Sequence, residues 1–454
     1  MPRRDISENA AQNADTSGRG GGGTAGAGST VGTAGGAVIV VMNLPVPDDH
    51  RVWVEARTLH EAGLRVTVVC PAIRDYRPGR RRIDGIDVVY FRSFEGAGKI
   101  GTIVEGAWTT FAASSAAKRA LAGLRGAGPR SLQVCNPPDL TFGLLRWARR
   151  HGITTVYDQH DVVPLLASSR PSFRRLAPFF QYCERRTVAA ADAVLTPSLE
   201  QVQRLQDLYG RTAIVVRTAA VAERKDATAD NAPTDTKPTD TALEEAAHKE
   251  TVLGYLGVIG EQDGVGELLD AVHELRRRGR EDFRVEIAGD GPALPEVRAR
   301  AAELGLEDKV EFLGWIGRDQ IDALLRRIDA MVVPDPDIEF NHYCAMNKVT
   351  HAMARGIPVV LRPLRENARL TGPAGIVAKD MGLPAFADAI ETLLDADPAR
   401  RAEIGAQLRT AFDAELSWAT SGPRYLSAFP AAAAATSAAP LTPASAPEQP
   451  ITES

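Results

Sequence analysis

Short, continuously apolar segments alternate with amphipathic ones along most of this chain. Because the short segments are apolar at successive positions, they predict strands of a parallel sheet that helices cover on both faces. In the first half, the expected strands are 37–42, 64–70, 86–91, 131–135, 153–157, 192–197 and 212–217. The expected helices between them lie near 51–62, 104–125, 139–151, 174–191 and 198–209.

The same alternation restarts in the second half, which predicts a second domain of the same kind. We therefore predict an α/β protein with two doubly wound, Rossmann-like domains. In such sheets ligands bind at the carboxyl ends of the strands, so the loops after the strands are the places to look for chemistry. The expected strands are 252–259, 283–289, 309–314, 330–334 and 358–361, and the expected helices lie near 265–278, 293–304, 318–327, 345–355 and 384–395.

Three compositionally biased stretches divide the chain. Residues 1–34 are rich in Gly, Ser, Thr and Ala, residues 222–249 are polar and charged, and residues 430–454 consist mainly of Ala, Pro, Ser and Thr. Such sequences bury too little apolar surface to fold, so they predict disordered termini and a linker. The two domains are then expected at 35–221 and 250–415.

The overall composition narrows the classes of function. Of the 454 residues, 44% are hydrophobic and 24% charged, which suffices for two full-size cores, and the net charge of -5 gives no indication of a nucleic-acid partner. The four cysteines form no CxxC pair, which argues against a zinc site or a disulfide framework and fits a reducing cytoplasm.

Neither a signal peptide nor a membrane-spanning run is apparent, so a cytoplasmic location is expected. Residues 170–180, RPSFRRLAPFF, mix arginines with apolar side chains. This segment leaves open a peripheral contact with the inner face of the membrane, although the first turns of an ordinary amphipathic helix have the same pattern.

Polar clusters follow two expected strands of the first half. Asn136 and Asp139 come after 131–135, and the sequence Asp158-Gln-His-Asp161 comes after 153–157. In the second cluster His160 lies between two carboxylates, which can orient an imidazole and tune its proton affinity. We therefore predict a catalytic site at Asp158, His160 and Asp161. The alternative is a polar turn in which an aspartate caps the next helix.

Asp48 and Asp49 follow the first expected strand, where a helix begins. Aspartate is favoured at the N-cap of a helix, so capping is one interpretation of this pair. The other is a functional loop at a helix N-terminus that faces the space between the domains.

The second half contains glycine-rich turns and a lysine that indicate phosphate binding. Glycines let the backbone approach a phosphate, and the amides at a helix N-terminus favour an anion. Lys348 is expected in the first turn of a helix, where its charge opposes the helix dipole and a bound anion would compensate. A solvated lysine is the alternative. The glycines are Gly257, Gly260 and Gly264, and one unit later Gly289 and Gly291.

Two motifs point to other chemistry but are incomplete. Residues 96–101, GAGKIG, match GxGxxG, yet residues 106–138 contain no acidic side chain to hold a ribose, so a dinucleotide-dependent oxidoreductase is a distant possibility. Asp335 and Asp337 have the spacing of a DxD metal pair, but the proline between them is more typical of a strand exit. We therefore predict no metal.

In these blocks the chain resembles the retaining GT-B glycosyltransferases of family four, over about residues 38–429. The resemblance implies that the two domains face each other across a cleft and that residues 416–429 cross back to the first domain. The blocks are LPVPDDHRVWVEA, CNPPDL, DQHD, CERRTVAAADAVLTPS, GYLGVIGEQDGV, GDGP and PDPDIEFNHYCAMNKVTHAMARGIPVV.

The resemblance also implies the substrates. The second domain would bind a nucleotide sugar, which is a co-substrate and not a cofactor, through Asn347, Lys348, His351 and the glycines. The first domain would bind a glycan, lipid-linked or natural-product acceptor near Asp48, Asp49, Asn136 and Asp139. The resemblance further implies that the sugar is transferred with retention of its anomeric configuration and without a metal.

Several family positions differ in this chain. His351 stands where the family has a glutamate for the donor ribose, and Tyr343 stands at its acidic partner. Val258 and Asp263 replace an Arg and Lys pair that many relatives place on the donor phosphates. These changes suggest either an altered donor or a catalytically inactive GT-B protein that binds a ligand or a partner.

Overall fold

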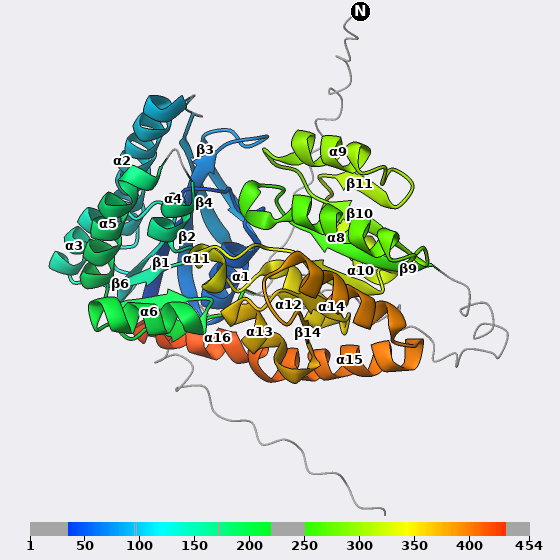
Figure 1. Ribbon diagram of the computed structural model, residues 1–454. Coiled ribbons are helices and arrows are strands. Elements are labelled where there is room, and N and C mark those ends of the chain that lie inside the picture. Colours follow the sequence, from blue (N-terminus) through cyan, green and yellow to red (C-terminus); the bar gives the residue numbers. More distant parts are fainter. Residues whose placement is uncertain (1–34, 95, 97, 171–172, 219–249, 433–454) are drawn as a thin grey trace, which may run out of the picture. The chain divides into compact units, whose positions relative to one another are not determined.

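Two sheets form the framework of the chain, and each has a hydrophobic core on both of its faces (Figure 1). The computed structural model describes residues 35–94, 96, 98–170, 173–218 and 250–432. Residues 1–34, the linker 222–249 and residues 433–454 of the predicted tail lie outside the described residues. The predicted fold class, two doubly wound α/β domains, is confirmed by this architecture.

The first sheet has eight strands in the order β3-β4-β2-β1-β5-β6-β7-β8, and all pairs are parallel except β3 with β4. Its strands are β1 (Gly35–Val40), β2 (Leu64–Ala72), β3 (Gly79–Ile83), β4 (Ile86–Arg92), β5 (Arg130–Cys135), β6 (Thr154–Asp158), β7 (Ala193–Thr196) and β8 (Ile214–Val215). The helices are α1 (His50–Glu61), α2 (Gly98–Gly123), α3 (Phe142–Arg150), α4 (Val163–Ser169), α5 (Ala177–Ala190) and α6 (Leu199–Tyr209).

The second sheet is wholly parallel, with six strands in the order β11-β10-β9-β12-β13-β14. Its strands are β9 (Thr251–Leu256), β10 (Phe283–Ala288), β11 (Val310–Gly314), β12 (Ala330–Val333), β13 (Val359–Leu361) and β14 (Ile376–Val377). The helices are α8 (Val265–Arg277), α9 (Leu294–Glu303), α10 (Arg318–Arg327), α11 (Glu339–His342), α12 (Asn347–Arg355), α13 (Arg365–Thr371), α14 (Leu383–Asp395), α15 (Pro398–Ala411) and α16 (Trp418–Ser427), with a π-helical turn, η5 (Phe412–Leu416), before α16.

The chain after the second sheet returns to the first one. In helix α16, Trp418 Nε1 donates to Thr58 Oγ1 of α1 at 2.9 Å, and Tyr425 Oη donates to Gln133 Oε1 of β5 at 2.6 Å. Tyr425 and Phe429 belong to the core that α1 forms with the first sheet. The last helix therefore completes a core that begins almost four hundred residues earlier in the sequence.

The boundary predicted for the C-terminal tail needs a correction. Ala431 and Ala432, which were assigned to the tail, are buried in the same core as Phe429. The backbone of β1 lies close to Ala431, because a Cβ atom added to Gly35 would be only 2.9 Å from the Cβ of Ala431. Both positions therefore require small side chains. An alanine-rich sequence thus packs against the first strand before the described chain ends.

We expect Phe429→Ala to lower the free energy of unfolding by about 3–5 kcal/mol, because it removes a fully buried ring and leaves a cavity. Urea unfolding followed by circular dichroism measures this change. Arg424→Ala, at an exposed position of α16, is the matched control and should stay within about 0.5 kcal/mol of the parent protein. Equal effects of the two substitutions would contradict the packing described for this segment.

Candidate active site

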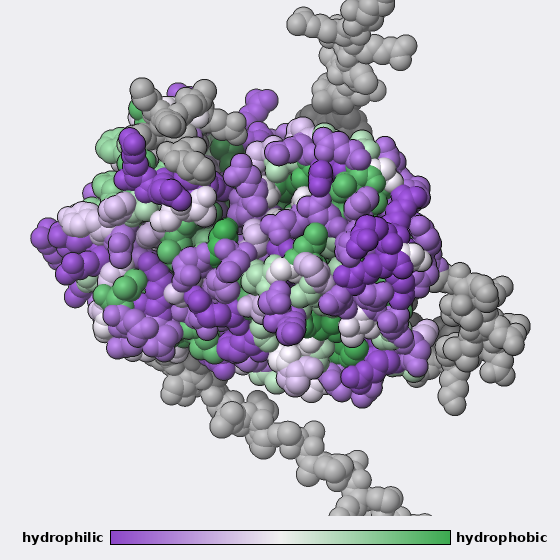
Figure 2. Space-filling model, in the orientation of Figure 1, coloured by the Kyte–Doolittle hydropathy of each residue, from purple (hydrophilic) through white to green (hydrophobic). Residues whose placement is uncertain are grey.

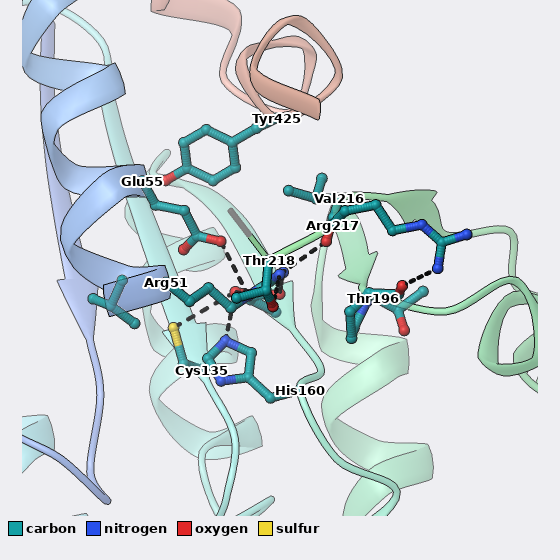
Figure 3. A network of polar contacts seen from close by, with 12 residues as sticks. Arg51, Glu55, Cys135, His160, Thr196, Val216, Arg217, Thr218 and Tyr425 are labelled. Atoms are coloured by element: carbon teal, nitrogen blue, oxygen red, sulfur yellow. Dashed lines mark hydrogen bonds and ion pairs between the residues drawn. The ribbon is translucent and has the colours of Figure 1, made fainter. Parts of the chain in front are cut away.

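A cluster of polar side chains surrounds Asp158, at the carboxyl end of β6. Arg51, Glu55 and His160 belong to it (Figure 3). Arg51 of α1 donates from Nη2 to Asp158 Oδ1 at 2.7 Å and from Nε to Asp158 Oδ2 at 3.2 Å. His160 places Nε2 at 2.7 Å from Asp158 Oδ2. Asp158 is fully buried, whereas the side chain of His160 is 15% exposed. The structure thus joins the predicted pair of Asp158 and His160 directly, with His160 on the solvent side.

A second set of contacts holds Asp158 from within the core. Gln133 of β5 donates from Nε2 to Glu55 Oε2 at 2.7 Å and to Asp158 Oδ2 at 3.3 Å. The Oε1 atom of Gln133 accepts the hydrogen bond from Tyr425. Glu55 also lies beside Arg51, with Oε1 at 3.2 Å from Nε. Helix α16 therefore contributes to the candidate site of the first sheet.

Charge is distributed unequally within this cluster. Burial disfavours ionisation of Asp158, but the charges of Arg51 and His160 outweigh it and hold the pKa of Asp158 far below its usual range. Burial and the neighbouring Asp158 raise the pKa of Glu55 to about 8, so Glu55 holds a proton at neutral pH. Burial opposes the charge of His160, yet Asp158 raises its pKa above the ordinary value.

Asn136 fixes the loop that carries His160. Its Oδ1 accepts hydrogen bonds from the backbone amides of His160 at 2.6 Å and Asp161 at 3.1 Å, and its Nδ2 donates to Asp161 O at 2.7 Å. Burial raises the pKa of Asp161, against the charges of His160 and Arg170. The two predicted clusters of the first half are therefore adjacent, and Asn136 holds the loop that carries His160.

Asp139 lies in the core beside this arrangement, close enough for Asn136 and Asp161 to act on its carboxyl group. It is fully buried and accepts a short hydrogen bond from Tyr157 Oη, while its carbonyl oxygen accepts one from Thr187 Oγ1 at 2.9 Å. Burial raises the pKa of Asp139 to about 7. Its acceptor-side role stays a prediction, but its contacts are those of a residue that supports the fold.

Asp48 and Asp49 have different surroundings. Asp49 is the N-cap of α1, where Oδ1 accepts from the amide of Val52 at 3.1 Å. Asp48 is exposed and accepts a hydrogen bond from Tyr76 Oη at 2.8 Å. Capping therefore accounts for Asp49, and only Asp48 presents its carboxylate at the surface.

Lys348 forms a second buried cluster, at the carboxyl ends of β9 and β12. Its Nζ atom lies 2.8 Å from Asp335 Oδ2, 3.4 Å from Tyr255 Oη and 4.6 Å from the centre of the Tyr255 ring. Burial disfavours the charge, but Asp335 raises the pKa of Lys348. The anion that compensates this lysine inside the protein is thus Asp335, one of the two aspartates of the apparent DxD pair.

Close chain packing accounts for several of the predicted phosphate-binding glycines. A Cβ atom on Gly264 would collide with the backbone of Pro334, and one on Gly291 would collide with the backbone of Ile259. A Cβ atom on Gly289 would collide with the backbone of Gly257. A Cβ on Gly257 would lie 3.5 Å from Lys348 Cε. The amide of Gly260 donates to Asp263 Oδ2 at 3.0 Å. Gly257 is thus the glycine placed beside Lys348, and phosphate binding by the whole set stays a prediction.

The remaining donor-side residues lie on α12. Asn347 is exposed in its first turn. His351 is half-buried, and burial together with the charges of His50 and Arg355 lowers its pKa to about 4. His351 therefore carries no positive charge near neutral pH, so any contact with a donor would involve a neutral ring.

The two clusters approach each other through Gln201 of α6. Its Nε2 donates to His160 O at 3.5 Å and to Tyr343 O at 3.2 Å. The charges of Asp161 and Lys348 both act on Cys344, and the charge of Arg170 acts on both Asp161 and Asp263. Residues from both halves of the chain thus share one neighbourhood.

The pattern of the sequence did not indicate several members of these clusters. Arg51 and Glu55 have the spacing of an ordinary surface ion pair on a helix, and Gln133 sits within an apolar strand. The sequence contains one signal for these residues: Arg51, Glu55 and Gln133 are polar side chains at positions that the apolar pattern assigns to the core. The resemblance placed the segment that contains Tyr425 against the first domain, but it did not indicate the contact with Gln133, which is almost three hundred residues away.

Within the described ranges, Cys135, Asp158 and His160 are the side chains whose ligand atoms lie close enough to share a metal ion. Both oxygens of Asp158 already accept hydrogen bonds from Arg51, and burial raises the pKa of the Cys135 thiol well above its usual value. The guanidinium of Arg51 thus already engages the two carboxylate oxygens that would bind a metal cation. This donor set does not fit a metal.

The comparisons with known proteins identify first the class and then the family. Residues 50–219 match a family model described as a glycosyl transferase 4-like domain, and residues 250–396 match one described as glycosyl transferases group 1. With the two doubly wound sheets, these matches define a GT-B glycosyltransferase. The chain belongs to family four of these proteins, which confirms the resemblance.

Two relatives come from Streptomyces kanamyceticus. Alpha-D-kanosaminyltransferase is 28% identical over 256 residues, which are 55% of this chain and 63% of that protein. 2-Deoxystreptamine glucosyltransferase is 29% identical over 235 residues, which are 51% of this chain and 54% of that protein. This chain therefore spans less than two thirds of the length of these curated relatives.

Solved structures share the fold at lower identity. Sucrose-phosphate synthase from Thermosynechococcus elongatus superposes with a TM-score of 0.67 at 17% identity, over 86% of this chain and 97% of that one. Anabaena HepE in complex with UDP superposes with a TM-score of 0.58 at 15% identity, over 86% and 98%.

No helix among the described residues is long and apolar enough to cross a membrane. In the segment predicted to touch a membrane, Phe179 is exposed at the start of α5. The peripheral contact and the cytoplasmic location stay predictions.

Glu55→Gln should change how stability depends on pH. The folded chain holds a proton on Glu55 up to about pH 8, whereas the unfolded chain releases it near 4.5, so Glu55 makes the folded state less stable as pH rises between these values. Glutamine does not titrate and keeps the shape. We expect the variant to gain more than about 1 kcal/mol relative to the parent between pH 5 and pH 8.

Urea unfolding at several pH values measures this gain. Glu61→Gln, at an exposed position of the same helix, is the matched control and should follow the parent protein. Parallel stability curves for Glu55→Gln and the parent would show that Glu55 is ionised in the folded chain.

Proposed function

We propose that this protein is a glycosyltransferase that moves a sugar from a nucleotide-sugar donor to an acceptor hydroxyl, with retention and without a metal. The observation that carries the proposal is the meeting of two clusters at the carboxyl ends of strands from different sheets. One contains His160 and the other contains Lys348. Gln201 joins the backbone of His160 to that of Tyr343, five residues before Lys348, and the charges of Asp161 and Lys348 both act on Cys344. Doubly wound sheets bind ligands at this end.

His160 is the proposed side chain at the reacting centre. Asp158 engages Nε2, which leaves Nδ1 of the ring for a substrate hydroxyl. Because Asp158 raises the pKa of His160, a proton on the ring is favoured, and a charged imidazole donates strong hydrogen bonds. Its role is to position a hydroxyl group and to meet negative charge there. Asp158 and Asp161 shape its charge and its loop.

The second cluster is the proposed diphosphate site. Lys348 and the neighbouring backbone at Gly257 would stabilise the charge that develops on the leaving nucleotide. Anabaena HepE, with the same fold, binds UDP, which supports a nucleotide donor for this chain. The contact of both Asp158 oxygens with Arg51 supports transfer without a metal.

Among the predicted acceptors we favour a natural product of the aminocyclitol type. One Streptomyces relative is named for 2-deoxystreptamine, which is an aminocyclitol, and the other is named for a kanosaminyl group, which is an amino sugar. Retention is proposed from family membership alone, and the anomeric configuration of the product, observed by NMR, tests it.

One observation favours the alternative of a non-catalytic GT-B protein. Asp335 already neutralises Lys348, and Tyr343 and His351 occupy the family's acidic positions. In this case the same site would bind a sugar ligand, or the chain would assist a true transferase.

Calorimetry with UDP-, GDP- and dTDP-sugars separates these functions, followed by turnover with aminocyclitol acceptors. We expect one nucleotide series to bind and to be consumed. Binding without turnover would favour the non-catalytic protein. Binding of none of the three series would sink the transferase proposal.

Lys348→Met should lower kcat/KM for the donor by about 100- to 1000-fold, the usual cost of removing one group that stabilises the transition-state charge. Because the substitution also leaves Asp335 buried without its cation, thermal unfolding must show that the variant is folded, and Lys348→Met with Asp335→Asn removes both charges. Lys379→Met, at an exposed position, is the control. Unchanged kcat/KM in the folded variants would remove Lys348 from this role.

A further inference from the structure

The side chain of Arg51 reaches acceptors on three separate parts of the first domain. It is 6% exposed and contacts Asp158 at the end of β6, Glu55 on its own helix and the segment after β8. In that segment, Nη1 donates to Val216 O at 2.8 Å and to Thr218 Oγ1 at 3.3 Å (Figure 3). A buried guanidinium with this many directed contacts has one possible orientation.

The orientation of Arg51 determines the orientation of Asp158. Two nitrogens of the guanidinium bond to different oxygens of the carboxylate, and such a two-point contact fixes the plane of the carboxylate as well as its position. Asp158 Oδ2 then points at Nε2 of His160. Arg51 therefore acts on His160 through Asp158.

The same guanidinium links His160 to the second half of the chain. Between the two acceptors after β8 lies Arg217, whose side chain donates to Glu366 of α13 at 2.6 Å and to Glu415 of η5 at 2.9 Å. The residues that hold Arg51 in place are thus held by carboxylates from the second half of the chain, Glu366 of α13 and Glu415 of η5.

We propose that Arg51 is a positioning residue of the transferase reaction, and that its forked shape, more than its charge, sets the orientation of Asp158 and His160. Lysine carries the same charge but presents a single nitrogen, so it cannot bond both oxygens of Asp158 and Val216 O together. The effect on turnover rests on the proposed function, whereas the effect on His160 does not.

The titratable and charged groups that act on His160 are Asp158 at the end of β6, Asp161 on the loop of His160, Arg51 and Glu55 of α1, and Asp49 at the N-cap of that helix. In Arg51→Lys these charges are all retained. The carboxylate loses its fixed plane, so the bond to His160 weakens and the pKa of His160 falls. If Arg51 acted only through its charge, the pKa of His160 would not fall in Arg51→Lys.

The experiment compares Arg51→Lys with Arg57→Lys, an exposed arginine of the same helix. The ring signals of His160 are followed by NMR during a pH titration and assigned by their loss in His160→Gln. We expect the pKa of His160 to fall by about one unit in Arg51→Lys and to stay unchanged in Arg57→Lys. An unchanged pKa in a folded Arg51→Lys variant overturns the proposal.

Turnover is the second measurement. A small misplacement of a group at the reacting centre costs about tenfold to a hundredfold, so kcat should fall by this factor while KM for the donor changes less than about threefold. Full activity of Arg51→Lys also overturns the proposal. If the parent protein turns over no donor, the transferase proposal fails, and the titration still decides the role of Arg51.

Thr218→Val keeps the test decisive if Arg51→Lys does not fold. It removes one acceptor of Arg51 Nη1 and leaves every charge in place. We expect a smaller fall of the His160 pKa in the same direction. No fall in this variant overturns the proposal.

Discussion

A buried cation without a partner is so costly that the whole neighbourhood of Arg51 is built to compensate it. The guanidinium draws together α1, the end of β6 and the chain after β8, none of which are neighbours in the sequence. Beside Arg51, Asp158 is ionised, whereas burial and the charge of Asp158 keep Glu55 neutral. The ionised Asp158 is then the anion that pairs with His160. The charge states of the candidate site thus follow from the placement of a single side chain.

The same constraint joins the two halves of the chain. Arg217 is almost completely buried, and its two terminal nitrogens pair with Glu366 of α13 and Glu415 of η5, which come from the second half of the chain. Its backbone amide donates to Ser421 of the last helix at 3.2 Å. Since that helix also reaches Gln133 through Tyr425, the second half of the chain supports the candidate site at two points. The contacts that hold the fold together are therefore also contacts that position His160.

The apolar pattern sufficed for the sheets but not for the site. The inner strands were predicted within a few residues because both of their faces are buried. Strand β3 was missed, since GRRRI lies at the sheet edge and is mostly exposed, and β14 is too short to leave a pattern. Helices α4, α11, α13 and α15 were not predicted.

His160 and Asp158 were found because they follow a strand. The partners of these residues, Arg51, Gln133 and Tyr425, depend on tertiary contacts that no local pattern contains.

The pairing of Lys348 changes how the second cluster would receive a diphosphate. The sequence suggested a lysine that awaits an external anion, but Asp335 supplies one, and burial raises the pKa of nearby Asp263 to about 6. Burial also raises the pKa of Asp335, and the charge of Lys348 opposes that rise, so Lys348 and Asp335 stabilise each other's charge within the protein. On the proposed function, a donor must share Lys348 with Asp335 and obtain further stabilisation from backbone amides, which carry no counter-charge. Because amides act only at short range and in fixed directions, donor binding would then depend on the geometry of the turn at Gly257 more than on net charge. The close backbone packing at Gly264, Gly289 and Gly291 holds that turn in place.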